Sequence, residues 1–460
     1  MTSPLPGLLA RHDARDPVLW CTSGPIDAAT LRRRVLQVAS RLPEGDGAVL
    51  VSCLDTTSFV VAVLAAWRRG LPIALPPNTR ARTLEEIREQ ASICTEIHDA
   101  DPRLAFDAER DTVEDDVLVD AAPGYRMASV YTSGSTGAHD IVHKSAVQLL
   151  GEAGVLATRF ELDARARVLS TVPPHHIYGL LFGVFVPLCC GGSIVATVPF
   201  HAPAVEAVAR ASQATVLVST PAHLRGLELV DSEAVRSVTR VFSSGAPLHA
   251  STAAKSRARF GCSVTEILGS TETGGIGWRQ ADGTSDVPWR PLPGVRVGTA
   301  ADGQLLLWSD FLPGELPQPF VADDRIELLD SPAEHEQLFR HLGRTDDVVK
   351  VGGKRISLGM LEARLRSLPA VRDAAVFADE APVGHDRRIR AVVVAPGKDP
   401  DTLRRALLEW FDPVVVPRRI VMVDELPRES TGKLRRAALK ALLDGESGRR
   451  VSRGQAQTSR

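Results

Sequence analysis

The distribution of apolar and polar residues predicts that helices and strands alternate over the first hundred residues. Apolar residues recur at helical spacing over residues 26–42, where Arg32, Arg33 and Arg34 fall on the outer face. The other elements expected here are a strand at 47–54, a helix at 58–69, a strand at 71–75 and an amphipathic helix at 83–91. Strands that alternate with helices favour a largely parallel sheet with helices on both faces, so we expect an α/β fold.

One stretch, residues 177–200, contains no charged residue and is long enough to span a bilayer. Pro187 and the cluster around Gly191 and Gly192 interrupt it, and residues 193–198 form a separate apolar run. A core helix, a turn and a core strand therefore explain the stretch better than a membrane span.

Length and composition limit the kinds of protein that this chain can be. A chain of 460 residues is expected to form two or three domains. A formal charge of -2 gives no reason to expect nucleic acid or an anionic membrane as a partner. The six cysteines form no Cys-x-x-Cys pair, which indicates reduced thiols and a cytoplasmic location. The first fifteen residues lack a basic start followed by an apolar stretch, so we expect no signal peptide.

A loop rich in glycine and hydroxyl residues follows the apolar strand expected at 127–131. Its residues are Thr132, Ser133, Gly134, Ser135, Thr136 and Gly137. Glycines let the backbone approach a ligand closely, and hydroxyls with successive N–H groups can surround phosphate oxygens. Ala138 follows Gly137 where a Walker A loop has lysine, and Ser133 stands where a nucleophile elbow has glycine. We interpret the loop as a phosphate cradle, against the alternative of a surface turn.

This loop resembles the Thr-Ser-Gly-Ser/Thr-Thr-Gly loop of the adenylate-forming (ANL) superfamily of acyl-CoA synthetases, aryl-acid ligases and peptide-synthetase adenylation domains. Further motifs of that superfamily are matched, in order, at residues 173–180, 243–248, 266–274, 320–325, 341–354 and 427–433. The resemblance thus covers residues from about 130 to 434. It implies a large N-terminal domain of parallel-rich sheets covered by helices, together with a small mobile α+β domain.

The resemblance also implies boundaries for these domains. We expect an N-terminal adenylation core over 1–343, a C-terminal lid over 344–442 and a disordered tail over 443–460. The elements expected in the lid are a helix at 358–368, strands at 374–377 and 390–394, and a helix at 401–411. Asp346 matches the hinge about which the lid of the family turns.

The matched motifs assign roles residue by residue. The catalytic residues implied are Lys433, Glu272 and Thr271, with Glu272 also binding Mg²⁺ through its carboxylate. The residues implied to bind ATP are the loop Thr132–Gly137 together with Lys144, Gly245, Ala246, Leu268, Gly269, Asp324 and Arg344. Those implied to line the pocket for the acid are His176, Ile177, Tyr178, Gly179, Ala246 and Leu268. The plainer alternatives are a core histidine at 175, a strand–turn–helix connection at 243–248 and a surface loop at 324.

The sequence departs from the superfamily pattern at three places. His139 and Asp140 stand where Pro-Lys is usual, and Lys144 is the nearest lysine that could reach back to the phosphates. Leu268 replaces the tyrosine that stacks beside adenine, which opens the pocket. Ala322-Asp323 replaces the Thr-Gly before the acid that binds ribose.

The reaction implied is ATP-dependent activation of a carboxylic acid to an acyl-AMP, followed by transfer to a thiol. The cofactors implied are ATP, Mg²⁺ and coenzyme A or phosphopantetheine. The length of the chain and Lys144 resemble the hydroxybenzoate ligases of xanthomonadin and aryl-polyene pigment pathways, which load an acyl carrier protein. The alternatives are a medium-chain fatty acyl-CoA ligase and a non-catalytic nucleotide-binding relative.

Overall fold

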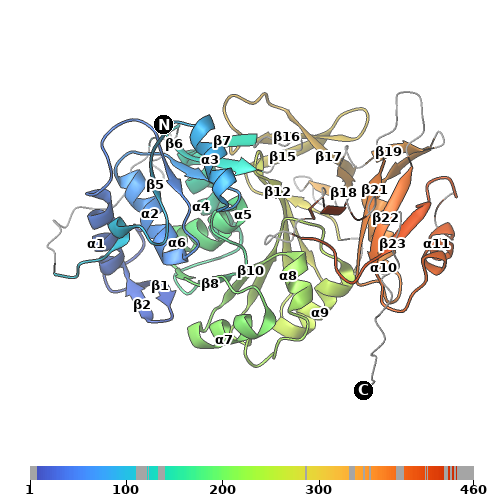
Figure 1. Ribbon diagram of the computed structural model, residues 1–460, viewed down its shortest axis with the longest axis horizontal. Helices are drawn as coiled ribbons and strands as arrows, with labels where there is room; N and C mark the ends of the chain where they lie inside the picture. Colours follow the sequence, from blue (N-terminus) through green and yellow to red (C-terminus); the bar gives the residue numbers. More distant parts are fainter. Residues whose placement is uncertain are drawn as a thin grey trace, which may run out of the picture. The chain divides into compact units, whose positions relative to one another are not determined.

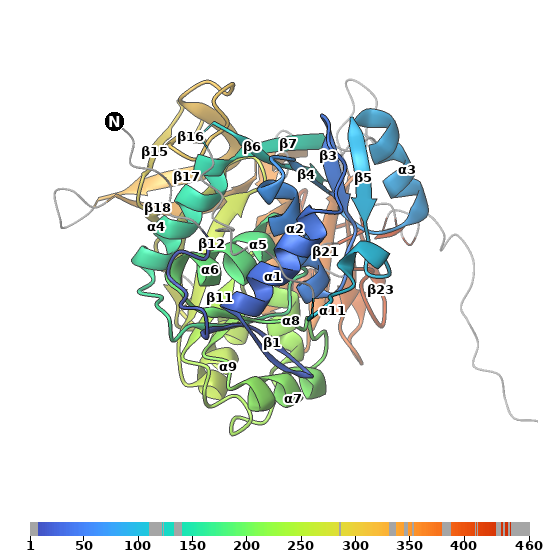
Figure 2. The same cartoon turned by 90° about the vertical axis from the view of Figure 1, so that its left-hand side faces the viewer.

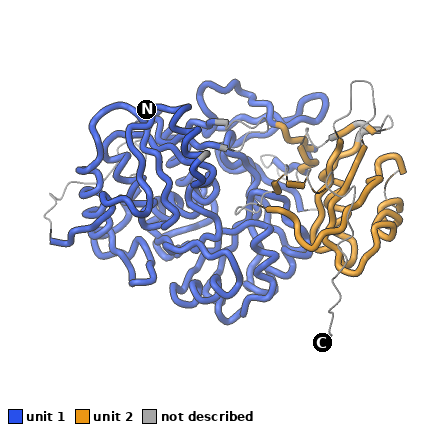
Figure 3. Tube along the Cα trace, in the orientation of Figure 1, with its two compact units in different colours: residues 1–322, 327–340 blue, residues 323–326, 341–460 orange. Residues whose placement is uncertain are grey.

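The contacts within the chain divide it into two units (Figure 3). Unit 1 comprises Met1–Ala322 and Glu327–Arg340, and unit 2 comprises Asp323–Ile326 and His341–Arg460. The main break lies close to the predicted boundary between residues 343 and 344, but the short segment Asp323–Ile326 also groups with unit 2. The computed structural model describes residues 8–109, 122, 124–132, 140–284, 287–330, 337–344, 348–351, 354–379, 388–409, 411, 413–428, 434–435, 438–439 and 442.

The largest sheet of unit 1 has nine strands, and its central strands are parallel (Figure 1). In order across the sheet they are β14 (Arg290–Pro291), β13 (Gly274–Ala281), β12 (Val264–Ser270), β11 (Arg240–Ser243), β10 (Val216–Ser219), β8 (Arg167–Ser170), β9 (Ser193–Val195), β1 (Pro17–Cys21) and β2 (Gly24–Asp27). Neighbours from β12 to β1 pair in parallel, whereas β13, β14 and β2 pair antiparallel at the two ends.

Two further sheets contain strands of unit 1, and the second of them also includes Asp323–Ile326 and His341–Arg344 of unit 2. One has the order β5 (Ile93–Ile97), β3 (Ala48–Val51), β4 (Ile73–Leu75), β6 (Arg126–Thr132) and β7 (Asp140–Ser145). All its neighbouring strands pair in parallel except β6 and β7. The other consists of β15 (Val295–Thr299), β16 (Gln304–Ser309), β17 (Phe320–Leu329) and β18 (Leu338–Arg344).

A helical layer separates the nine-stranded and five-stranded sheets (Figure 2). Alternation along β3 shows the arrangement, because Val49 and Val51 face this layer whereas Leu50 packs with Ile87 on the other face. The helices of the layer are α1 (Ala28–Ala39), α2 (Thr56–Arg68), η2 (Val147–Gly151), α4 (Glu152–Arg159), α5 (Ile177–Leu180), η3 (Leu181–Phe185) and α6 (Val186–Cys190). The outer helices are α3 (Ala81–Gln90) on one side and α7 (Ala202–Ser212), α8 (Pro221–Gly226) and α9 (Ala250–Phe260) on the other. Unit 1 is therefore a five-layered α/β structure.

Unit 2 is a small α+β domain. Its strands are β19 (Val348–Val351), β20 (Lys354–Ser357), β21 (Asp373–Ala378), β22 (Ile389–Val394) and β23 (Arg419–Met422), and its helices are α10 (Leu358–Ser367) and α11 (Pro400–Leu408). Leu361 and Leu403 bring the two helices onto one face of the β21–β22–β23 sheet. Leu426 and Leu439 cover the other face.

Most of the elements predicted from periodicity are present, and the α/β fold class is confirmed. The stretch at 177–200 forms α5, η3, α6 and β9, as predicted, and Gly191 ends α6 with φ +81°. No helix among the described residues is long and apolar enough to cross a membrane. The strands that were not predicted include β1 and β2, which form a short hairpin, and β5.

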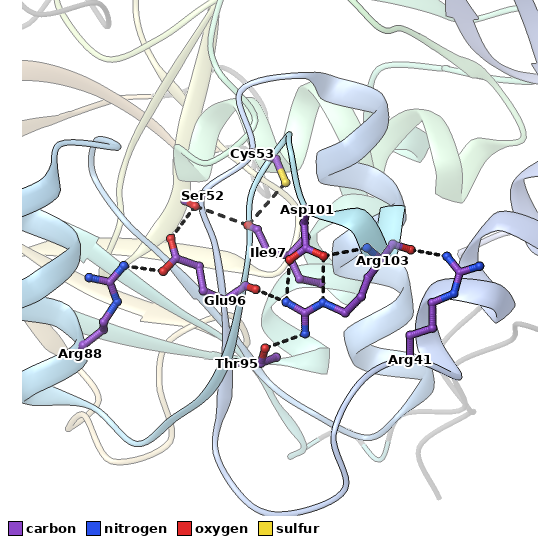
Figure 4. Close-up of polar contacts among 9 residues, drawn as sticks. All are labelled: Arg41, Ser52, Cys53, Arg88, Thr95, Glu96, Ile97, Asp101 and Arg103. Atoms are coloured by element: carbon purple, nitrogen blue, oxygen red, sulfur yellow. Dashed lines mark hydrogen bonds and ion pairs between the residues drawn. The ribbon is translucent and has the colours of Figure 1, made fainter. Parts of the chain in front are cut away.

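A network of polar contacts ties β5 to the short 3₁₀-helix η1 (Pro102–Leu104) that follows it (Figure 4). The guanidinium of Arg103 donates to both carboxylate oxygens of Asp101 at 2.9 and 2.6 Å. It also donates to the hydroxyl of Thr95 at 2.7 Å and to the backbone carbonyl of Glu96. Arg41 of α1 donates to the carbonyl of Arg103 at 2.7 Å. Hydrogen bonding to Arg103 holds the pKa of Asp101 below its usual value.

Replacing Arg103 by alanine should lower the free energy of unfolding by about 2 kcal/mol, because the buried Asp101 carboxylate then loses its main partner. Arg165→Ala is a matched control: Arg165 also follows an aspartate by two residues and pairs with it at 2.6 Å, as Arg103 does. The Arg165 side chain is 90% exposed whereas that of Arg103 is 24% exposed, so the control should lower stability much less than Arg103→Ala does. Urea-induced unfolding measures both, and equal losses would show that burial does not strengthen the pair.

Candidate active site

Parallel strands of the nine-stranded sheet end side by side at one edge. Ser219 of β10 lies beside Ser243 of β11, and Ser243 lies beside Glu266 of β12. β12 then continues to Ser270 before the chain turns into β13. The segments predicted to bind substrates follow these strands, so they share the carboxyl edge at which open α/β sheets bind ligands.

The loop after β11 is anchored to β12 at both of its ends. The hydroxyl of Ser244 donates to a backbone carbonyl of β12 at 2.8 Å, and the N–H of Leu248 donates to the carboxylate of Glu266 at 2.9 Å. Between these anchors Gly245, with φ +87°, and Ala246 are exposed. A loop with fixed ends and small exposed residues at its tip leaves backbone available to a ligand.

The turn between β12 and β13 carries Thr271 and Glu272, which are both half-buried. Side chains within the turn close it, because the N–H of Ser270 donates to the hydroxyl of Thr273 at 3.1 Å and the N–H of Thr273 donates to the hydroxyl of Ser270 at 3.2 Å. Gly274 follows with φ +69°, a conformation that favours glycine. The predicted catalytic pair therefore lies on a compact turn with defined geometry.

Just before this turn the two strands approach more closely than side chains allow. A Cβ on Gly269 would lie 2.4 Å from the carbonyl oxygen of Gly274, and the β12–β13 register shifts between Leu268 and Gly269. Gly269 is thus required by the packing of the bulge itself. Leu268 is half-buried and Gly269 is exposed.

Lys144 lies on β7 and is almost completely buried, with 1% of its surface exposed. Its ammonium group donates to the backbone carbonyl of Glu272 at 3.1 Å. Burial lowers its pKa, against the opposing effect of the carboxylates of Glu152 and Glu272. This side chain therefore joins the five-stranded sheet to the turn that carries the predicted catalytic pair.

Glu152, at the start of α4, is a site residue that the sequence analysis missed. Its carboxylate accepts a hydrogen bond from the N–H of Gly275 at 2.6 Å, and 3% of its surface is exposed. Burial raises its pKa to about 7, while Lys144 and the Gly275 N–H oppose that shift. The signal in the sequence was a single carboxylate inside the otherwise apolar stretch 149–157.

Strands β6 and β7 flank the predicted phosphate loop. They pair antiparallel up to Thr132 and Asp140, so the strand predicted to lead into the loop is present. The predicted loop residues Ser133, Gly134, Ser135, Thr136 and Gly137 lie outside the described residues.

The segment after β8 contains the residues predicted for the acid pocket. His175 is buried and burial lowers its pKa to about 4, whereas His176 is half-buried with its ring centroid 4.5 Å from that of His175. Ile177 and Tyr178 are half-buried at the start of α5. Gly179 is buried against backbone, because a Cβ there would lie 2.2 Å from the carbonyl oxygen of Pro173.

Unit 2 contains the remaining described candidates. Asp324 forms a contact of 2.7 Å with the imidazole Nε2 of His341, and Arg344 lies 3.3 Å from Asp323. The predicted hinge, Asp346, and the predicted catalytic lysine, Lys433, lie outside the described residues.

The residues that flank Lys433 are held at a defined place in unit 2. Arg428 and Leu434 form an antiparallel bridge, and the N–H of Arg435 donates to the carbonyl of Pro427 at 3.0 Å. Arg428 also pairs at 2.7 Å with Asp373, which is largely buried on β21. The two ends of the segment that carries Lys433 are therefore fixed to the sheet.

The described residues fit a Mg²⁺ ion whose other ligands would be water molecules and phosphate oxygens. No group of three or more His, Cys, Asp or Glu side chains is placed to hold a metal in the described part of the chain. A single half-buried carboxylate, Glu272, suits Mg²⁺, since this ion is usually held by one or two carboxylates together with substrate phosphates.

Comparison with known families identifies the class of this protein. Residues 11–316 match the AMP-binding enzyme family, and residues 360–433 match the AMP-binding enzyme C-terminal domain. The chain belongs to this family of adenylate-forming enzymes. The prediction of an AMP-forming acid–thiol ligase is thereby confirmed, whereas the narrower resemblance to hydroxybenzoate–carrier-protein ligases is not.

Individual relatives agree with this assignment. The chain is 30% identical over 332 residues to 4-coumarate–CoA ligase of Halorhodospira halophila, which covers 69% of this chain and 78% of the relative. It is 27% identical over 467 residues to anthranilate–CoA ligase of Pseudomonas aeruginosa, with 89% of both chains covered. The structure of ATP-bound MatB from Rhodopseudomonas palustris has the same fold, with a TM-score of 0.80 at 22% identity over 94% of this chain and 98% of that one.

Gly179→Ala should lower the free energy of unfolding by about 2 kcal/mol, because the added methyl group would overlap the carbonyl of Pro173 and displace the segment that carries His176. Gly154→Ala in α4 is the matched control, since a Cβ at Gly154 meets nothing within 4 Å. There the better helix propensity of alanine should raise stability by up to about 1 kcal/mol. Thermal unfolding of the two variants checks this, and a Gly179 variant as stable as the Gly154 variant would contradict the packing argument.

Proposed function

We propose that this protein activates an aryl carboxylic acid with ATP and transfers the acyl group to a phosphopantetheine thiol. The observation that carries the proposal is the turn with Thr271 and Glu272 at the carboxyl edge of the parallel sheet, beside the loop with Gly245 and Ala246. Two of the relatives are named as ligases of aromatic acids, coumarate and anthranilate, and this supports the aryl class.

In the first step, a carboxylate oxygen of the acid attacks the α-phosphorus of ATP, and the bond to pyrophosphate breaks. Thr271 is expected to donate its hydroxyl to the α-phosphate, and the loop Thr132–Gly137 to hold the other phosphates. Lys433 would lie between the two anions and neutralise the charge that builds up as they meet. Bound through Glu272, Mg²⁺ would neutralise charge on the phosphate oxygens.

In the second step, the sulfur of the thiol attacks the acyl carbon, the bond between this carbon and AMP oxygen breaks, and the thiol proton is released. The relatives named above use coenzyme A. We propose a hydroxybenzoic acid as substrate and an acyl carrier protein as acceptor, on the basis of Lys144 and the sequence Gly-Ser-Thr-Glu at 269–272. The six cysteines are all free, which suits the cytoplasmic location that we expect.

Lys433→Ala should reduce acid-dependent ATP–pyrophosphate exchange at least a hundredfold, because the transition state loses its point charge. The exchange is measured with a panel of benzoates, cinnamates and medium-chain fatty acids. Lys398→Ala, at an exposed position of the same unit, is the control and should keep the wild-type rate.

Three results of this panel would have different meanings. Exchange with hydroxybenzoates that disappears in the Lys433 variant supports the proposal in full. Exchange only with fatty acids would keep the mechanism and reject the aryl substrate. No exchange with any acid, in a protein that still binds ATP, would reject the enzyme reaction itself.

The acceptor is tested separately, with the acid that gives the fastest exchange. Purified enzyme, ATP and Mg²⁺ are incubated with coenzyme A or with a phosphopantetheinylated acyl carrier protein, and thioester formation is followed by mass spectrometry. We expect kcat/KM to be at least tenfold higher with the carrier protein. The reverse preference would leave adenylation intact and assign coenzyme A as the acceptor.

A further inference from the structure

Two buried charged residues meet the turn between β12 and β13 from outside. Lys144 comes from β7 of the five-stranded sheet, and Glu152 comes from the start of α4 in the central helical layer. Neither belongs to the nine-stranded sheet that carries the turn. The β7–α4 connection between them includes η2, which is a π-helix. Such turns are often found where a helix positions a functional group.

The two side chains contact different backbone groups of the same turn. Lys144 donates to the carbonyl of Glu272 at 3.1 Å, and Glu152 accepts from the N–H of Gly275 at 2.6 Å. The contact at Glu272 fixes the tip of the turn, and the contact at Gly275 fixes the point where it joins β13. Thr271 therefore lies between β12 and a backbone segment held at two points.

Glycines at two positions allow the carboxylate to come this close. A Cβ on Gly274 would lie 2.6 Å from the carboxylate of Glu152, and one on Gly275 would lie 3.1 Å from it. The same Gly274 has φ +69°. Gly274 and Gly275 thus leave the space that the carboxylate of Glu152 occupies, and any larger residue at Gly274 would displace this carboxylate.

Burial strengthens these two hydrogen bonds and makes the loss of either partner costly. Lys144 is 1% exposed and Glu152 is 3% exposed, so water does not compete for their hydrogen-bonding groups. Loss of either partner leaves a polar group buried without compensation. The turn consequently has one favoured position relative to the helical layer.

We propose that Lys144 and Glu152 are positioning residues that hold the Thr271-Glu272 turn in the geometry that adenylation needs. Lys144 acts through the backbone carbonyl of Glu272, to which its ammonium group donates. This inference rests on the proposed function for the roles of Thr271 and Glu272, but the two contacts themselves do not depend on it. A displacement of about 1 Å in such a turn is enough to slow the chemistry a hundredfold.

Three variants separate the contacts. Lys144→Met keeps the length of the side chain and removes the donor to Glu272, while Glu152→Leu removes the acceptor for Gly275. Glu152→Gln retains an amide oxygen that can accept from Gly275 and keeps the size of the side chain, so it should fold even if the other two are unstable. Arg103→Ala is the control, because it lowers stability in unit 1 away from this turn.

Kinetics of ATP–pyrophosphate exchange gives the first readout. Lys144→Met and Glu152→Leu should reduce kcat at least tenfold, leave KM for the acid within about threefold, and raise the Mg²⁺ concentration for half-maximal rate. Glu152→Gln should retain most of kcat. The double variant Lys144→Met/Glu152→Leu should lose little more than the worse single variant, because both act on one turn. Arg103→Ala should keep wild-type kcat at a temperature where it is folded.

Hydrogen–deuterium exchange of the protein without substrates gives the second readout, which is independent of activity. A peptide spanning residues 268–276 should exchange at least tenfold faster in Lys144→Met and Glu152→Leu than in the wild type, and Arg103→Ala should show no such local change. Folded variants with wild-type kcat and wild-type exchange in this peptide would overturn the proposal. If the wild type adenylates no acid, the proposed function fails, and the peptide measurement still decides whether the two residues hold the turn.

Discussion

The helical layer between the two large sheets of unit 1 excludes water, and this constraint decides where polar groups can stand. Every residue from Phe59 to Trp67 of α2 is buried. The indole N–H of Trp67, which enters the layer, donates to the carbonyl of Met127 at 2.9 Å. The polar residues predicted to bind ligands therefore lie at the ends of the strands, where the loops after β8, β11 and β12 share one edge of the sheet.

Periodicity predicted the elements with a strong apolar or helical pattern, and it missed short or half-buried strands. α2 and β3 are buried on all or nearly all sides, and their apolar runs are unmistakable. β5 was missed because four of its five residues are only half-buried and show no alternation. The hairpin of β1 and β2 was missed because two short strands carry too few residues to establish a period of two.

The site could be predicted where the ligand chemistry determines residue type, and not where tertiary packing does. Small residues at 245 and 246 and the Thr-Glu pair at 271–272 stand out as motifs because the backbone or a carboxylate must reach a ligand. Lys144 was recognised as important, but its partner lies 128 positions away along the chain, and no local pattern indicates which group a buried ammonium will contact. The departure from the family motif at Ala322 also has a local explanation. Ala322 is 4% exposed, so a larger polar residue at this position would be buried.

The energetics of buried charges explain why Lys144 and Glu152 are better understood through the backbone than through their mutual attraction. A pair of opposite charges in a protein interior often gives no more stability than apolar side chains of similar volume, because desolvation offsets the attraction. An apolar pair at these positions, however, would leave the carbonyl of Glu272 and the N–H of Gly275 without the partners they have here. Each of these buried backbone groups would then cost about 1–3 kcal/mol, or the turn would move until water reached them. A turn that moves towards water carries Thr271 and Glu272 with it. The turn therefore keeps its position only if the side chains at 144 and 152 are polar and can pair with its backbone.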